Sequence, residues 1–161
     1  ASRGLGDVYK RQEDEKEART RMEKVIASGK ALDKFADFVE AQGGRKEQVY
    51  HPQLLAKAAI TETITAPEDG YVEALNAMAI GTACMSLGGG RETKESQIDL
   101  TAGIRLKKKI GDSVKKGECL AELYGNDAAK CNDAKELVQN AFLFSKEPLD
   151  APETVLKYIT A

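Results

Sequence analysis

Two glycine-containing turns constrain the fold of this chain more than any other feature of its sequence. They are Ala66-Pro67-Glu68-Asp69-Gly70-Tyr71-Val72 and Gly111-Asp112-Ser113-Val114-Lys115-Lys116-Gly117. Glycine permits positive φ where strands reverse sharply, and a valine between two such glycines is suited to point inward. Together the two turns predict a flattened β-sandwich built from short strands.

The periodicity of the remaining sequence predicts both strands and helices. Residues 60–66 alternate isoleucine with threonine, a pattern typical of a half-buried strand. Further extended segments are expected at residues 71–75, 98–110, 118–124, 142–146 and 155–159. Apolar residues recur at helical spacing in residues 13–28, 30–42, 77–87 and 128–141, and Asn76 and Asp127 can cap the last two helices. Helices and short strands interspersed in this way predict an α+β fold.

The first two predicted helices meet at Gly29, and we expect them to form an αα-hairpin. Each has one apolar face, and two such faces need another surface to bury against. We therefore expect exposed apolar surface around Leu32, Phe35 and Phe38 in the chain on its own.

Length and composition exclude several classes of protein. The chain has 161 residues and a formal net charge of −2, which gives no general attraction to nucleic acid or anionic lipid. No apolar run approaches the ~20 residues that span a bilayer. Three cysteines without a CxxC pair favour reduced thiols in the cytoplasm, and their apolar positions favour core packing. These cysteines are Cys84, Cys119 and Cys131.

Residues 1–12 have no starting methionine and no clear period. They resemble translated adapter sequence, and we expect them to be a non-native leader outside the fold.

The glycine run that ends in Arg91 is the one weak candidate for an anion site. Backbone amides of Gly88-Gly89-Gly90 together with Arg91 could face a phosphate. The run follows a predicted helix instead of opening one, however, and lacks the GxxxxGK[ST] pattern. We favour a glycine-rich helix stop in which Arg91 pairs with a nearby acid such as Asp99.

Other candidate residues favour structural roles. The lysines at 107–109, 115 and 116 could contact nucleic acid, but no aromatic residues lie among them, so a solvated strand edge is favoured. His51, the only histidine, has no nucleophile motif beside it, and one histidine with three scattered cysteines makes a poor zinc site. Glu62 lies on the apolar face of a predicted strand, where a satisfied ion pair is expected.

A biotinyl or lipoyl carrier domain shares the same turns and is the sharpest alternative. Such carriers attach their cofactor to a lysine at the tip of a hairpin. Here the strand at 118–124 is followed by Gly125, and the next lysine, Lys130, lies in a predicted helix. The segment between the two turns is also too long for a carrier.

The combination of motifs resembles the pyrimidine-nucleoside phosphorylase and thymidine phosphorylase family. The matching motifs are Ala31-Leu32-x-x-Phe35, Ala41-Gln42-Gly43-Gly44, Ala66-Pro67-x-x-Gly70-Tyr71-Val72, Leu87-Gly88-x-Gly90-Arg91, Ile98-Asp99, Gly103 and Gly111-Asp112-x-Val114. The resemblance implies that residues 13–58 are the helical end of a larger α/β domain. It also implies that residues 59–161 form the C-terminal domain, a barrel-sandwich hybrid or α/β-hammerhead.

The resemblance further implies a parent enzyme, a pentosyltransferase, that reversibly phosphorolyses uridine, thymidine or deoxyuridine to free base and pentose 1-phosphate. Phosphate would be its co-substrate, a potassium ion would order part of its active site, and the parent would be a cytoplasmic homodimer. The family's glycine-rich phosphate loop does not occur in this sequence. We therefore assign no catalytic, substrate-binding or metal-binding residue here, and we expect a structural role and no activity from this chain alone.

Overall fold

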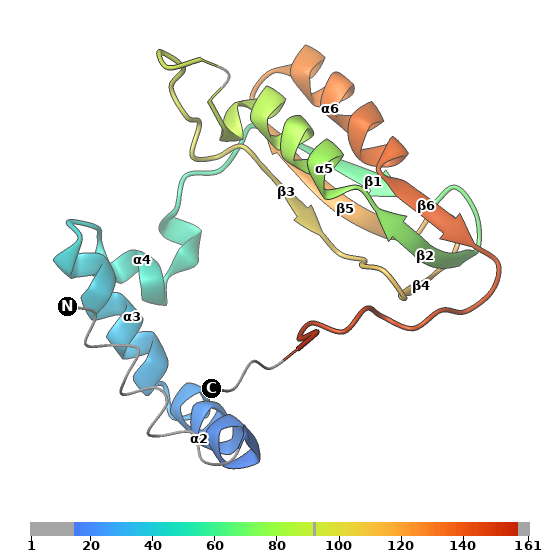
Figure 1. The fold of residues 1–161 in the computed structure, drawn as a ribbon. Helices are drawn as coiled ribbons and strands as arrows, with labels where there is room; N and C mark the ends of the chain where they lie inside the picture. Colours follow the sequence, from blue (N-terminus) through green and yellow to red (C-terminus); the bar gives the residue numbers. More distant parts are fainter. Residues whose placement is uncertain (1–14, 92, 158–161) are drawn as a thin grey trace. The chain divides into compact units, whose positions relative to one another are not determined.

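The computed structural model describes residues 15–91 and 93–157, and the chain divides into two compact units (Figure 1). The first unit ends at Leu55 and the second begins at Ala56. Residues 1–12, expected to be a leader, lie outside the described residues. The division of 13–58 and 59–161 into domains stays a prediction.

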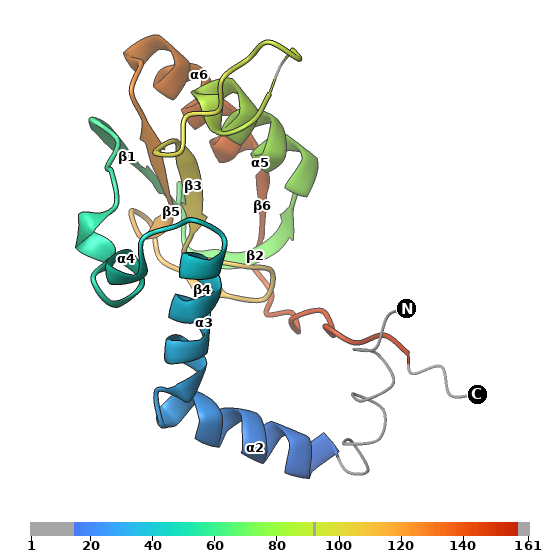
Figure 2. The same cartoon turned by 90° about the vertical axis from the view of Figure 1, so that its left-hand side faces the viewer.

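The first unit is helical. Its elements are α2 (Glu15–Ala27), α3 (Lys30–Ala41), α4 (Lys46–Tyr50) and the 3₁₀ turn η1 (Pro52–Leu54). Gly29, with φ of 79°, ends α2 and directly precedes α3, as its sequence position predicted. Only Ser28 and Gly29 separate the two helices. The helices meet at a steep angle (Figure 2). The predicted αα-hairpin is therefore a helical corner.

The apolar face of α3 is exposed, as predicted. Leu32, Phe35 and Phe38 are 45%, 52% and 59% exposed. Polar contacts attach α4 to α3: the Tyr50 hydroxyl donates to Asp33 Oδ1 at 2.9 Å, and Lys46 Nζ lies 2.6 Å from Asp37 Oδ1.

The second unit contains two antiparallel sheets of three strands each. One sheet has the order β1 (Ile60–Thr65), β5 (Cys119–Gly125), β3 (Gly103–Leu106). The other has the order β4 (Ser113–Val114), β2 (Gly70–Leu75), β6 (Phe142–Ser145). Helix α5 (Ala77–Cys84), which continues into the π-turn η2 (Met85–Gly89), and helix α6 (Ala128–Asn140) complete an α+β domain (Figure 1).

The core forms where the predicted alternation places apolar side chains. Along β1 the isoleucines face inward and the threonines outward, and Ile64 is fully buried. Val114, predicted to point inward between the turns, is 4% exposed. Among the described residues, the largest fully buried side chains are Ile64, Leu120, Leu123, Val72, Val138 and Cys131.

Both predicted helix caps are confirmed. Asn76 Oδ1 accepts from the Ala79 backbone N–H at 3.1 Å. Asp127 Oδ1 accepts from the N–H groups of Ala129 and Lys130 at 2.9 and 3.0 Å.

Two predicted strands are wrong in part. Of residues 98–110, only Gly103–Leu106 forms a strand, because Asp99 folds the preceding residues into a turn by accepting from the Thr101 N–H at 2.9 Å. Residues 155–157 form no strand, and 158–159 lie outside the described residues.

Truncation of Leu123 tests the core. Leu123 is fully buried in the central strand, so Leu123→Ala is expected to lower the free energy of unfolding by about 2–5 kcal/mol. Urea titration followed by circular dichroism measures the change. The control Leu156→Ala, at a residue that is 87% exposed, should shift the midpoint little. Equal shifts for the two variants would contradict this core.

Candidate functional site

The glycine run before Arg91 packs against its own domain. Gly88, with φ of 101°, accepts a hydrogen bond at its carbonyl from the Asp99 N–H at 2.8 Å. A side chain at Gly89 would lie 2.9 Å from Cys84 Sγ, so this position needs a glycine for close packing. The run thus follows a helix and is packed against its own domain.

The predicted pairing of Arg91 with Asp99 is wrong. Arg91 is exposed, and among the described residues the salt bridges do not include this pair. The Asp99 carboxylate is instead held by Thr101, whose N–H and hydroxyl donate to Oδ1 at 2.9 and 2.7 Å, and by Asn126 Nδ2, which donates to Oδ2 at 2.6 Å.

Asn126 connects three segments that are far apart in sequence. Its Nδ2 also donates to Thr101 Oγ1 at 2.8 Å, and its Oδ1 accepts from the Ala59 N–H at 2.7 Å. We call these four residues, Ala59, Asp99, Thr101 and Asn126, the Asn126 network. Hydrogen bonds from Thr101, followed by that from Asn126, lower the pKa of Asp99 below its usual range.

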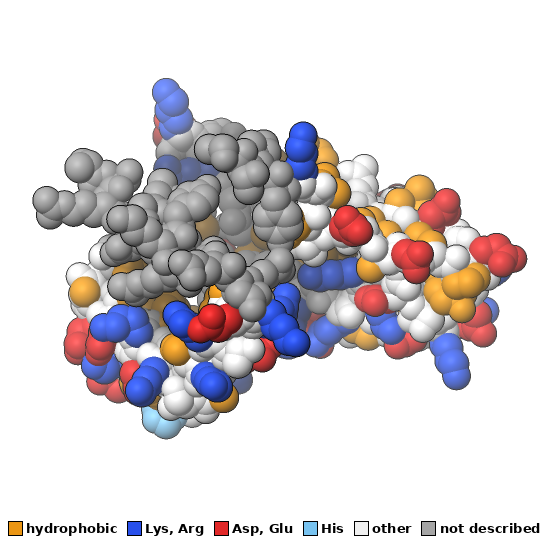
Figure 3. All heavy atoms as spheres, turned by 60° about the horizontal axis from the view of Figure 1, so that its bottom comes forward, with side chains coloured by type: hydrophobic (Ala, Val, Ile, Leu, Met, Phe, Trp, Pro, Cys, Tyr) orange, Lys and Arg blue, Asp and Glu red, His pale blue; other side chains and the backbone are white. Residues whose placement is uncertain are grey.

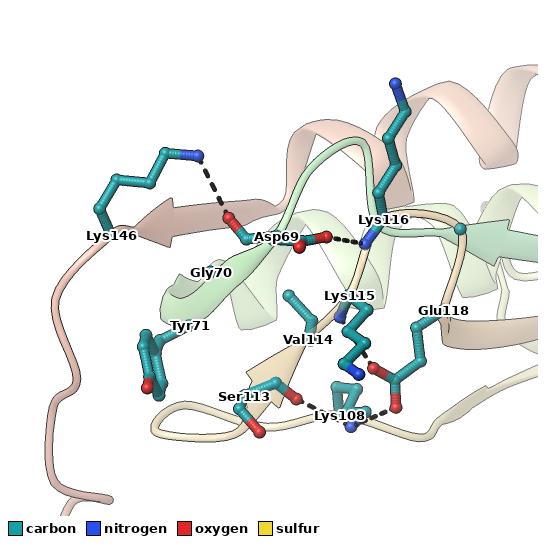
Figure 4. Close-up of a pocket in the computed structure, with 11 residues that line it drawn as sticks. Asp69, Gly70, Tyr71, Lys108, Ser113, Val114, Lys115, Lys116, Glu118 and Lys146 are labelled. Atoms are coloured by element: carbon teal, nitrogen blue, oxygen red, sulfur yellow. Dashed lines mark hydrogen bonds and ion pairs between the residues drawn. The ribbon is translucent and has the colours of Figure 1, made fainter.

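An open hollow of about 890 Å³ lies at the two glycine turns (Figure 4). Lysine side chains line it, but carboxylates of the same turns accompany them. Lys108 Nζ lies 2.7 Å from Glu118 Oε1 and 2.9 Å from the Ser113 carbonyl oxygen, and Lys146 pairs with Glu68. These pairs partly neutralise the positive charge of the hollow.

The same carboxylates satisfy backbone donors of the second turn. Glu118 Oε2 accepts from the Lys115 N–H at 2.9 Å, and Asp69 Oδ1 accepts from the Lys116 N–H at 2.6 Å (Figure 4). Backbone amides that could have faced an external anion are therefore occupied internally. The hollow is therefore lined by a turn whose backbone N–H groups are capped by nearby acidic side chains of the same domain.

Charge along the lysine-rich segment that follows β3 is also balanced. Lys107 Nζ lies 3.0 Å from Glu122 Oε2, and Figure 3 shows acidic and basic side chains interspersed where the surface is described. These lysines are therefore solvated and charge-balanced, but they follow β3, which ends at Leu106, and do not lie on a strand edge. Tyr124, and after it Lys107, lower the pKa of Glu122, and Lys108 lowers that of Glu118.

An apolar groove of about 570 Å³ lies between β2, α5, the end of β3 and the segment at 151–154. Its walls are mainly Leu75, Ile80, Leu106, Ile110 and Pro152. The segment approaches the second turn closely, because a side chain at Gly111 would lie 2.9 Å from the Ala151 nitrogen. No motif in the sequence predicted that residues 151–154 would lie beside Gly111.

The remaining candidates have structural surroundings. Glu62 is paired with Lys135 Nζ at 3.0 Å, as expected. Burial raises the pKa of the Cys131 thiol, whereas Cys84 and Cys119 are only partly buried. His51 is exposed, and Lys130 lies in α6 as predicted. Over residues 15–91 and 93–157, no group of three His, Cys, Asp or Glu side chains could hold a metal ion.

The carboxylates of the glycine turns and the Asn126 network therefore hold backbone and side chains of their own domain in place. The second unit is an α+β domain, and comparison with known proteins shows its family. The family model described as "Pyrimidine nucleoside phosphorylase C-terminal domain" matches residues 71–145.

Curated relatives extend the match. The chain is 43% identical over 144 residues to "Pyrimidine-nucleoside phosphorylase" of Geobacillus stearothermophilus, covering 89% of this chain and 33% of that protein. Proteins with the same name from Bacillus subtilis (strain 168) and Staphylococcus haemolyticus are 50% and 46% identical over 110 residues, covering 68% of this chain and 25% of each relative. The chain belongs to the pyrimidine-nucleoside phosphorylase family and carries its C-terminal domain. It spans about a third of the length of the Geobacillus relative.

Acid should destabilise the second unit. The pKa values of Asp99, Glu118 and Glu122 are lowered in the folded state, so the unfolded chain binds their protons first as the pH falls. Their contribution to stability is present above about pH 4.5 and is lost as the pH falls through the folded pKa values. Urea midpoints at pH 6, 4 and 3 measure this loss, which Asp99→Asn with Glu118→Gln should reduce. A midpoint that rises on acidification would contradict the prediction.

Proposed function

We propose that this chain is the C-terminal part of a pyrimidine-nucleoside phosphorylase and has a structural role in that enzyme. The match of residues 71–145 to the C-terminal domain, and of 89% of the chain to a phosphorylase about three times as long, carries this proposal. The parent enzyme would be a pentosyltransferase that converts uridine, thymidine or deoxyuridine and phosphate to free base and pentose 1-phosphate.

The fold supports a more specific architecture. Two three-stranded antiparallel sheets, joined through glycine turns with Val114 buried between them, suit a barrel-sandwich hybrid of the α/β-hammerhead kind. The helices of the first unit would complete the larger α/β domain of the parent. Their exposed apolar faces support this role, because such faces require a covering surface.

The chemistry would lie outside this chain. Phosphorolysis needs a site that holds phosphate against the anomeric carbon and stabilises the departing base. The acids and backbone amides of the glycine turns are engaged with one another, and Arg91 stays only a weak candidate for an anion contact. Phosphate, the potassium ion that the family resemblance implies, and the pyrimidine nucleoside would all bind in the rest of the parent.

The family resemblance also supports proposals on the location, oligomeric state and substrate class of the parent. None of the described helices is long and apolar enough to cross a membrane. We propose a cytoplasmic homodimer that acts on nucleosides and not on nucleic acid. The carrier alternative is disfavoured because β5 leads into α6, which contains Lys130, and not into a lysine-tipped hairpin.

Uracil release from uridine and phosphate tests the proposed function. Absorbance should detect turnover by the chain extended to the length of its Geobacillus relative, and none by this chain alone. Turnover by this chain would place catalytic groups within it and would contradict the structural role. Inactivity of the extended protein would overturn the proposed reaction, and a mass increase from attached biotin or lipoate would then identify a carrier.

The apolar face of α3 is tested with a hydrophobic dye. Phe35→Gln with Phe38→Gln should reduce fluorescence of bound 8-anilinonaphthalene-1-sulfonate, because both side chains are more than half exposed. Lys34→Gln, on the same helix with a side chain 84% exposed, is the matched control and should leave dye binding unchanged. Unchanged dye binding by the double phenylalanine variant would show that this face is not the exposed apolar surface.

A further inference from the structure

The two units are joined by a short segment without regular structure. Residues 56–58 have no assigned helix or strand, and Lys57 is exposed. Within the described chain, no hydrogen bond or ion pair includes Ala56, Lys57 or Ala58, although Ala58 is half-buried. A segment without backbone hydrogen bonds has low local stability.

Order begins abruptly at the next residue. Strand β1 starts at Ile60, which lies opposite Gly125 of β5. If this antiparallel register is continued by one residue, Ala59 lies opposite Asn126. At that step the Ala59 N–H donates to Asn126 Oδ1 at 2.7 Å, so a side-chain oxygen replaces the backbone acceptor of a sheet.

The orientation of the Asn126 amide is determined by its other contacts. Nδ2 donates to Asp99 Oδ2 at 2.6 Å and to Thr101 Oγ1 at 2.8 Å. A carboxylate accepts and cannot donate, so the amide nitrogen must face Asp99 and the amide oxygen must face Ala59. Asp99 is itself attached to the end of η2, because its N–H donates to the Gly88 carbonyl oxygen at 2.8 Å.

We propose that Asn126 is a latch that fixes Ala59 to the second unit. The latch thereby limits backbone flexibility between the units to residues 56–58, which we call the bending segment. The latch acts as a positioning device: it determines where the ordered domain begins. Without it, the first residues of the edge strand β1 would join the bending segment. The proposal rests on this hydrogen-bond network and not on the activity of the parent protein.

Nuclear magnetic resonance on the full chain tests the latch directly. In the wild-type protein, amide order parameters should be below about 0.6 at residues 56–58 and near 0.85 from Ala59 onward. Asn126→Asp keeps an acceptor for Ala59 but places a second carboxylate beside Asp99. This variant should raise the hydrogen-exchange rate of the Ala59 amide roughly threefold to tenfold, the range expected for loss of one hydrogen bond.

An exchange of the two side chains restores the network in reverse. In Asn126→Asp with Asp99→Asn, the amide at 99 can donate to the carboxylate at 126, which still accepts from Ala59. This double variant should return Ala59 exchange toward the wild-type rate. Asn132→Asp, at an exposed position of α6, adds the same charge elsewhere and should have no effect on Ala59.

Three results would overturn the latch. The first is wild-type order at residues 56–58 equal to that of β1. The second is an unchanged Ala59 exchange rate in folded Asn126→Asp. The third is failure of the double variant to restore protection while the amides of β5 stay protected. If Asn126→Asp does not fold, the wild-type order parameters and the double variant still decide.

Discussion

The pairing of β5 with strands on both sides is the interaction on which the second unit depends. β1 and β3 each pair with β5 and not with one another, so the sheet exists only through this strand. Its inward side chains Leu120 and Leu123 are 1% and 0% exposed. The register joins Thr65 to Cys119, distant in sequence, and closing so long a loop costs entropy that the burial of β5 must offset.

The glycine turns hold that pairing in place, and this explains their chemical character. Gly111 and Gly117 have φ of 93° and 83°, values that residues with a side chain rarely adopt. The acids beside the turns accept their backbone N–H groups, as Glu118 does for Lys115 and Asp69 for Lys116. The charged residues that make this region conspicuous in sequence therefore maintain its backbone.

Most features predicted correctly depend on local contacts, whereas the misses include one local turn, Asp99 to Thr101, and several distant contacts. The alternation of β1 and the caps Asn76 and Asp127 depend on neighbours within a few residues, and each was predicted. The role of Asp99 was not, because one of its partners, Asn126, lies 27 residues away. The approach of Ala151 to Gly111 was missed for the same reason. The family resemblance, by contrast, was recognised from several separated motifs, and it is confirmed.

The position of Asn126 links these constraints. It directly follows β5 and directly precedes Asp127, the cap of α6, so the end of the central strand also determines where the helix begins. Its amide extends the β1–β5 register by one residue at the edge where the first unit joins the second. An edge strand is most easily frayed at its terminal residue, since that residue lacks a neighbour on one side. A side chain attached to the central strand is therefore well placed to keep motion of the connecting segment from entering the sheet.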